Sequence, residues 1–250
     1  MEFRDVLKKL DSKDILILGK KDKSLFGIDI NDYPSIIVTG ETGAGKSVFL
    51  DQIICELIST HTSLEMGLVL VDTTGVELNK YADSRYAYFS SIGDDRKGLV
   101  CIAKVIREIL RRKTLFENER VINIHDYNEK VFSKLPLLVL AIDDNSSMLQ
   151  DNDTRKMIKN IINEIQGLGI LFILIENDVN NDFFKKDDNL DSSVLITFDQ
   201  ANAYQSENVN IPDADNLNIG KFLVRIEGQV EEYEDFKFDD NIIDEILETK

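Results

Sequence analysis

Cysteines are scarce in this sequence. Its 250 residues include only two, Cys55 and Cys101, and neither has a second cysteine at metal-binding or redox spacing. The sequence therefore gives no sign of a cysteine-based zinc site or a thiol redox motif. Each cysteine lies within an apolar pattern of helical spacing, so we predict that both belong to the hydrophobic core.

Long apolar runs are also missing. A membrane-spanning helix needs about 18 or more consecutive apolar residues, and no stretch of this sequence is that long. The first ten residues, MEFRDVLKKL, also lack the apolar stretch of a signal peptide. We therefore expect a cytoplasmic domain that meets a membrane only through a longer parent protein.

Basic residues are outnumbered by acidic ones. The chain carries 46 acidic and 29 basic residues, a formal charge of −17, which repels a phosphate backbone. This balance argues against strong nucleic-acid binding. A local basic stripe remains an alternative, and its best candidates share one predicted helix: Arg107, Arg111, Arg112 and Lys113. Basic residues on a helix more often form a solvated face.

The chain still has enough apolar residues for one large core. Hydrophobic residues make up 43% of it, and its length falls within the range of a single domain. We predict an N-terminal helix and entry strands, residues 1–34, packed on a core of residues 35–250.

Apolar strands and helices alternate along this core. The patterns predict strands at 15–18, 26–30, 35–39, 66–72, 86–90, 137–142, 170–175, 194–198, 221–226 and 230–236, and helices at 46–58, 96–116, 154–168 and 241–247. Polar segments 177–191 and 202–218 are predicted to be exposed and irregular. Central strands that are apolar throughout indicate an α/β fold, a mostly parallel twisted sheet with helices on both faces.

Residues 40–47 match the phosphate-binding pattern G-x-x-x-x-G-K-[ST]. They are Gly40, Glu41, Thr42, Gly43, Ala44, Gly45, Lys46 and Ser47. The loop leaves a predicted buried strand and opens a predicted helix, so that backbone N–H groups converge on phosphate oxygens. Lys46 is then placed to reach the β and γ phosphates of ATP, and Ser47 to coordinate Mg²⁺. The alternative is a chance glycine turn.

Two aspartates follow the apolar run 137–142. Asp143 stands at the carboxyl end of a predicted strand, where ligands of open α/β sheets gather, and is predicted to hold Mg²⁺. Asp144 occupies the position where a motor ATPase carries a catalytic glutamate, and its shorter side chain predicts weak catalysis. The alternative for both is that they cap the following helix.

At this point the chain resembles the RecA-like motor domain of the FtsK/SpoIIIE family. The likeness rests on GETGAGKS, on VDTTGVEL against D-P-K-x-x-E-L, and on 108–130, which follows the spacing E-x-x-R-R then N-x-x-x-Y-N-E-K. LPLLVLAIDD resembles the strand that carries the magnesium-binding aspartate. The resemblance implies a P-loop ATPase that uses ATP and Mg²⁺.

The chain departs from the family pattern in its second half. Where the family has T-Q-R-P this chain has Glu176, Asn177, Asp178 and Val179, so the glutamine that senses the γ-phosphate is missing from its expected place. The stretch DQANAYQSENV lacks the arginine that acts across a subunit interface. Loss of such an arginine can cost about 10³ to 10⁵ in rate. We therefore predict binding with weak or no hydrolysis.

The acidic charge favours the protein-secretion branch of this family over its DNA pumps. The resemblance to the EssC-type ATPases of type VII secretion implies partners that are secreted proteins and neighbouring ATPase domains of the same polypeptide. We expect a hydrophobic groove to receive an amphipathic helix of a secreted protein. Two alternatives are a competent ATPase motor in which Asp144 works as the base, and a DNA translocase domain. A third is a structural domain that binds no nucleotide.

Overall fold

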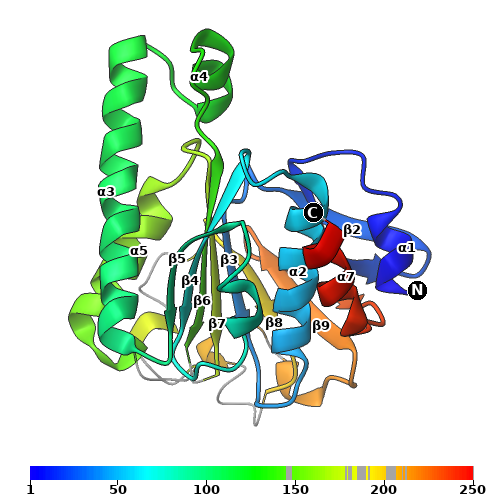
Figure 1. The fold of residues 1–250 in the computed structure, drawn as a ribbon. Coiled ribbons are helices and arrows are strands. Elements are labelled where there is room, and N and C mark those ends of the chain that lie inside the picture. Colours follow the sequence, from blue (N-terminus) through cyan, green and yellow to red (C-terminus); the bar gives the residue numbers. More distant parts are fainter. Residues whose placement is uncertain are drawn as a thin grey trace.

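The computed structural model describes residues 1–249 apart from 145–147, 178, 180–181, 185–189, 191, 201–206, 210 and 212. These residues form one ten-stranded sheet with helices on both faces (Figure 1). The predicted α/β class is confirmed.

The sheet joins a parallel part to an antiparallel part. Its strands, in chain order, are β1 (Ile15–Lys21), β2 (Ser24–Asp29), β3 (Ser35–Thr39), β4 (Met66–Asp72), β5 (Ala87–Ile92), β6 (Leu137–Asp144), β7 (Ile170–Glu176), β8 (Val194–Thr197), β9 (Lys221–Ile226) and β10 (Gln229–Glu234). In space their order is β2-β1-β10-β9-β8-β3-β7-β6-β4-β5. The run from β8 to β5 is parallel, and the pairs from β8 to β2 are antiparallel.

The helices form a layer on each face of this sheet. They are α1 (Phe3–Leu7), α2 (Lys46–Thr60), α3 (Asp95–Glu119), α4 (Ile124–Lys130), α5 (Asn152–Glu164) and α7 (Asn241–Thr249). α2 and α7 lie on one face, α3 and α5 lie on the other, and α3 extends beyond the sheet toward α4 (Figure 1).

Alternating side chains of the central strands feed two separate cores. Ile36 and Val38 of β3 belong to the core beneath α1, α2 and α7, whereas Ile37 belongs to the core beneath α3 and α5. Successive strand residues point to opposite faces, so a strand that is apolar throughout is buried on both. Cys55 and Cys101 are buried, one in each core, as predicted.

The predicted strands and helices are present in the structure, but most of their bounds differ by up to four residues. β3, β4 and β9 have the predicted bounds, while α5 ends at Glu164 and not at residue 168. Gly167 and Gly169, both at positive φ, form the turn that leads into β7. α4 was not predicted, because this short helix buries only Tyr127 and offers no apolar periodicity. Half of the residues in the predicted irregular segments 177–191 and 202–218 lie outside the described residues.

The N-terminal segment contributes strands to the same sheet. β1 and β2 form the predicted entry hairpin, and β1 pairs with β10 near the end of the chain. Glu2 also bridges to Lys237, so both ends of the chain meet on one side of the core. Within the described part of the chain no helix is long and apolar enough to cross a membrane.

Candidate nucleotide site

The loop after β3 turns sharply into helix α2. Its glycines at 43 and 45 have φ values of +85° and +112°, in the left-handed region that disfavours side chains. A Cβ added at Gly43 would meet nothing within 4 Å, because open space lies above this part of the loop. The loop thus exposes its backbone and the N-terminus of α2 toward the space where a phosphate chain would lie.

Lys46 is held inside this loop. Its side chain is 5% exposed, and its ammonium donates to the carbonyls of Gly40 at 2.8 Å and Glu41 at 2.6 Å. Burial lowers the pKa of Lys46 to about 8, against the opposing pull of the Asp143, Glu176 and Glu41 carboxylates. A buried ammonium with neutral carbonyls as its bonded partners gains strongly from an anion placed beside it.

Asp143 comes to the same place from β6. The register sets it beside Asp72 of β4 on one side and beside Ile175 of β7 on the other. Burial, together with the nearby carboxylates of Asp72 and Glu77, raises the pKa of Asp143 to about 7, although Lys46 opposes this rise. A cation at this carboxylate would relieve the same repulsion.

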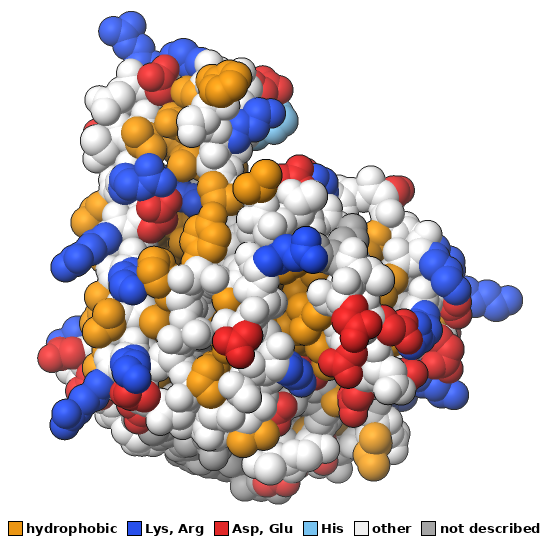
Figure 2. Space-filling view, viewed as in Figure 1, with side chains coloured by type: hydrophobic (Ala, Val, Ile, Leu, Met, Phe, Trp, Pro, Cys, Tyr) orange, Lys and Arg blue, Asp and Glu red, His pale blue; other side chains and the backbone are white. Residues whose placement is uncertain are grey.

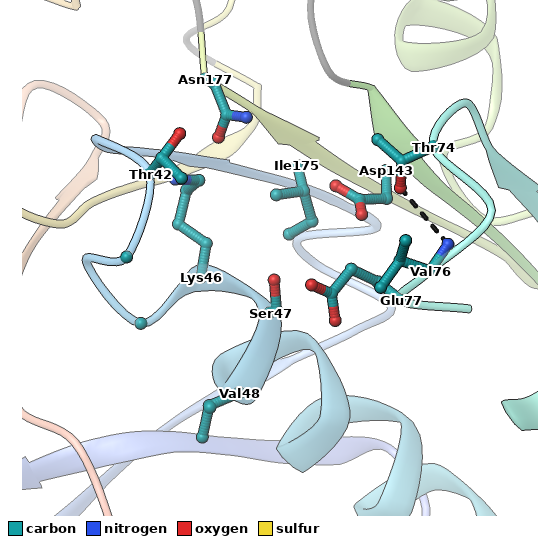
Figure 3. A pocket seen from close by; sticks show the side chains of 12 residues that line it. Thr42, Lys46, Ser47, Val48, Thr74, Val76, Glu77, Asp143, Ile175 and Asn177 are labelled. Atoms are coloured by element: carbon teal, nitrogen blue, oxygen red, sulfur yellow. Dashed lines mark hydrogen bonds between the residues drawn. The ribbon is translucent and has the colours of Figure 1, made fainter. Parts of the chain in front are cut away.

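These residues line one pocket of about 440 Å³ at the carboxyl ends of the parallel strands. Figure 3 shows Thr42 and Lys46 on one wall, Asp143 and Glu77 on the other, and Ser47 between them. Of the eight predicted loop residues, five line the pocket: Thr42, Gly43, Gly45, Lys46 and Ser47. The other three support the loop, since Gly40 and Glu41 bind the lysine and Ala44 packs on the core.

The part of the opposite wall that residues 73–78 form beside Asp143 was missed by the sequence reasoning. Asp72 is 1% exposed, and its carboxylate accepts hydrogen bonds from the backbone N–H groups of Thr74, Gly75 and Leu78 at 2.7 to 2.9 Å. These bonds fold residues 73–78 into a fixed turn that carries Thr74 and Glu77 into the pocket. The available signal was the likeness of VDTTGVEL to the family motif, which marks this strand end without saying where Glu77 points.

Asp144 does not line the pocket. Its side chain is 1% exposed, and it accepts hydrogen bonds from the N–H groups of Met148 at 3.1 Å and Leu149 at 3.0 Å. Asp143 and Asp144 are neighbours on one strand, so their side chains leave the sheet on opposite faces. Asp144 thus accepts from N–H groups at the start of the short 3₁₀ helix Met148–Gln150, a geometry that matches the capping alternative.

Asn177 does line the pocket, next to Ile175 at the end of β7. Figure 3 shows its amide on the side of Thr42, across the pocket from Glu77. The sequence comparison treated the sensing glutamine as missing here. The residue that lines the pocket at this strand end is Asn177, whose side-chain amide is one methylene shorter than that of glutamine.

The site also fits the ion that accompanies a triphosphate. The described residues hold no cluster of three or more His, Cys, Asp or Glu placed to bind a metal ion by themselves. Mg²⁺ in nucleotide sites is bound by one or two protein oxygens together with phosphate oxygens and waters. Ser47 and Asp143, which line the same pocket, match that donor set.

A mostly parallel sheet, in which a glycine-rich loop joins strand β3 to helix α2, places this fold in the class of RecA-like P-loop NTPases. Here β7 stands between the loop strand β3 and β6, which carries Asp143.

Within that class, the chain belongs to the FtsK/SpoIIIE family. The family model matches residues 9–166, more than half of the chain. The DNA translocase FtsK of Leptospira interrogans is 32% identical over 174 residues, which cover 65% of this chain and 18% of that protein. The matched region is about a fifth of the length of such relatives.

Solved structures share the fold at lower identity. The conjugation coupling protein TcpA of pCW3, in monomer form with ATPγS, has a TM-score of 0.83 at 22% identity, covering 96% of this chain and 71% of that one. The structure of ATPases 2 and 3 of EssC from Geobacillus thermodenitrificans has a TM-score of 0.80 at 17% sequence identity. The match covers 94% of this chain and 47% of that one. The structure of ATPases 2 and 3 of EccC from Thermomonospora curvata, in complex with a signal sequence peptide, has a TM-score of 0.73 at 16% sequence identity. The match covers 94% of this chain and 46% of that one.

Proposed function

We propose that this chain is an ATP-binding domain that requires Mg²⁺ and hydrolyses ATP weakly or not at all. One observation carries the proposal: Lys46 and Asp143, the expected phosphate and magnesium residues, line the same pocket. In a P-loop site, Mg²⁺ supplies charge neutralisation between the β and γ phosphates. Lys46 would bind these phosphates, and Ser47 with Asp143 would hold the ion.

The weak hydrolysis follows from what faces the γ-phosphate position. Asp144 is engaged by two backbone N–H groups and is buried away from the pocket. Glu77 lies on the same wall as Asp143 and points its carboxylate toward Ser47 (Figure 3). We assign to Glu77 the role of orienting the attacking water. Its carboxylate is positioned by the turn of residues 73–78, whereas Asp144 is positioned by strand β6.

We further propose a role in protein secretion of the type VII kind. The domain would recruit or move secreted proteins, next to further ATPase domains of the same polypeptide, as a cytoplasmic part of a membrane-anchored bacterial protein. The charge of −17 supports a protein substrate over a phosphate backbone. The fold likeness to EssC and to EccC, the latter solved with a signal sequence peptide, supports the same choice.

A competent motor is the second candidate, because the curated relatives at 27% to 32% identity are DNA translocases. Steady-state hydrolysis separates the two. Turnover below about 1 s⁻¹, with tight binding of a slowly hydrolysed ATP analogue, is expected for the proposed function. Turnover above that rate, abolished in Lys46→Ala, would establish the motor. A salt-sensitive shift of duplex DNA would make DNA its substrate.

A further inference from the structure

A second cavity of about 500 Å³ lies between α3 and the edge of the sheet, which we call the α3 groove. Its floor is apolar and buried: Val69 of β4, Val105 of α3 and Leu138 of β6. Figure 2 shows hydrophobic side chains along the junction between α3 and the rest of the molecule. From Leu138 to Asp143 the strand β6 covers about 16 Å, so the groove is separate from the nucleotide pocket.

Two exposed aromatic residues of edge strand β5 form the outer wall of the groove. Tyr88 is 48% exposed and Phe89 is 40% exposed. The register between β4 and β5 shifts at this point, since Leu68 pairs with Ala87 and Val69 pairs with Phe89. The extra residue is a β-bulge, which re-aims side chains and hinders the addition of another strand at the edge. The wall is therefore suited to side-chain contacts and not to strand pairing.

The predicted basic stripe on α3 survives only in part, and the surviving part borders this groove. Arg112 is 1% exposed and bonds Glu108 and the carbonyls of Pro136, Leu168 and Gly169. Arg111 also pairs with Glu108, and Lys113 pairs with Glu164. These three residues serve the chain's own fold.

Lys104 and Arg107 differ from these three residues. Both are exposed and line the groove, and neither forms an ion pair with any carboxylate of the described residues. The Lys104 ammonium lies 3.6 Å from the centre of the Phe89 ring. On a chain of charge −17, the rim of this groove is thus locally positive.

We propose that the α3 groove binds an acidic amphipathic helix of a partner protein. Apolar side chains at i, i+3 and i+4 would enter between Tyr88, Phe89 and the buried floor. Acidic side chains beside them would meet Lys104 and Arg107, the complementary charge that favours such a partner over a basic one. The proposal rests on the protein-secretion function above and extends it by assigning the surface that recognises the substrate, and it uses no residue of the nucleotide pocket.

A peptide selection tests the assignment and reveals the chemistry of the partner in the same experiment. A display library of random 16-residue peptides is selected on the 250-residue chain and counter-selected on a Lys104→Glu/Arg107→Glu variant. The expected winners are acidic, carry apolar residues at helical spacing, and bind the variant at least tenfold more weakly than the wild type. A second variant, Tyr88→Ser, keeps both cations and is expected to weaken the same peptides.

The variants must keep their melting temperature and their affinity for Mg·ATPγS, so that a lost peptide cannot reflect a damaged fold or a failed nucleotide site. The proposal is overturned if no peptide discriminates wild type from the charge variant, or if the winners are basic. A salt-sensitive duplex DNA complex that is lost in the charge variant would overturn it in favour of a nucleic-acid surface. Peptide binding with no nucleotide binding would leave the groove standing and remove the proposed ATP site.

Discussion

Lys46 and Asp143 meet across a single pocket although they come from different strand ends of the sheet, with β7 between β3 and β6. The ammonium lowers the pKa of the carboxyl, and the carboxylate raises that of the ammonium, but burial outweighs both effects and leaves the pKa values at about 8 for Lys46 and about 7 for Asp143. The two groups are therefore poorly compensated by each other. Mg²⁺ and a triphosphate would supply the charges that each lacks.

Replacing Asp144 tests whether it is a structural residue. Asp144→Ala leaves the N–H groups of Met148 and Leu149 without their buried acceptor, a loss of about 1–3 kcal/mol in the free energy of unfolding. Urea denaturation measures it. We expect the affinity for Mg·ATPγS to change less than twofold. Unchanged stability with a collapse of turnover would make Asp144 catalytic.

Replacing Glu77 tests the carboxylate that faces Ser47. Glu77→Gln keeps the size of the side chain and removes its ability to accept a proton, so any residual turnover should fall about 10²-fold. The affinity for Mg·ATPγS should stay equal or tighten slightly, because a negative charge leaves the pocket. Single-turnover hydrolysis and calorimetry give the two readouts. Asp144→Asn is the matched control, and an equal loss of turnover there would remove the special role of Glu77.

The buried carboxyl of Glu56 should make the stability of the fold depend on pH, independently of nucleotide binding. This residue of α2 is 1% exposed, its Oε1 accepts from the Ile17 N–H at 2.7 Å, and its Oε2 has no hydrogen-bond partner. Burial raises its pKa from 4.5 to about 8. The folded chain therefore holds a proton that the unfolded chain releases above pH 4.5. This contribution to stability is fully present below pH 4.5 and falls by about 1.4 kcal/mol per pH unit up to about pH 8.

The Glu56→Gln variant isolates that effect, since it mimics the neutral acid. The difference in unfolding free energy between variant and wild type should shift in favour of the variant from about pH 5 to about pH 8, as measured by urea denaturation at both values. A difference that is constant over this range would mean that Glu56 is ionised in the folded chain.

The central strands and the phosphate loop were predictable because a few local rules act together there. The segments 35–39 and 66–72 are apolar except at their ends and are followed by polar or glycine-containing turns, which define their bounds. In the loop, glycine spacing and the following helix fix where Lys46 and Ser47 lie.

Other parts of the site depend on contacts that the sequence does not display. The predicted strand ended at residue 142, but β6 continues through Asp144, and strand alternation then turns Asp144 away from the pocket. Glu77 is placed by the hydrogen bonds that Asp72 makes to the backbone of its turn. The arginine motif near residue 112 pointed to the family. In the structure, however, Arg112 donates hydrogen bonds to backbone carbonyls just before strands β6 and β7, so its role is structural.

The most direct test of the account is calorimetric titration of Mg·ATPγS into the wild-type chain and into Lys46→Ala. Lys104→Ala serves as a matched loss of one lysine outside the pocket. We predict saturable binding to wild type and Lys104→Ala, weakened at least tenfold when Mg²⁺ is chelated, and no measurable binding to Lys46→Ala. Equal affinity of Lys46→Ala and wild type, or no binding to wild type in the presence of Mg²⁺, would contradict the nucleotide site.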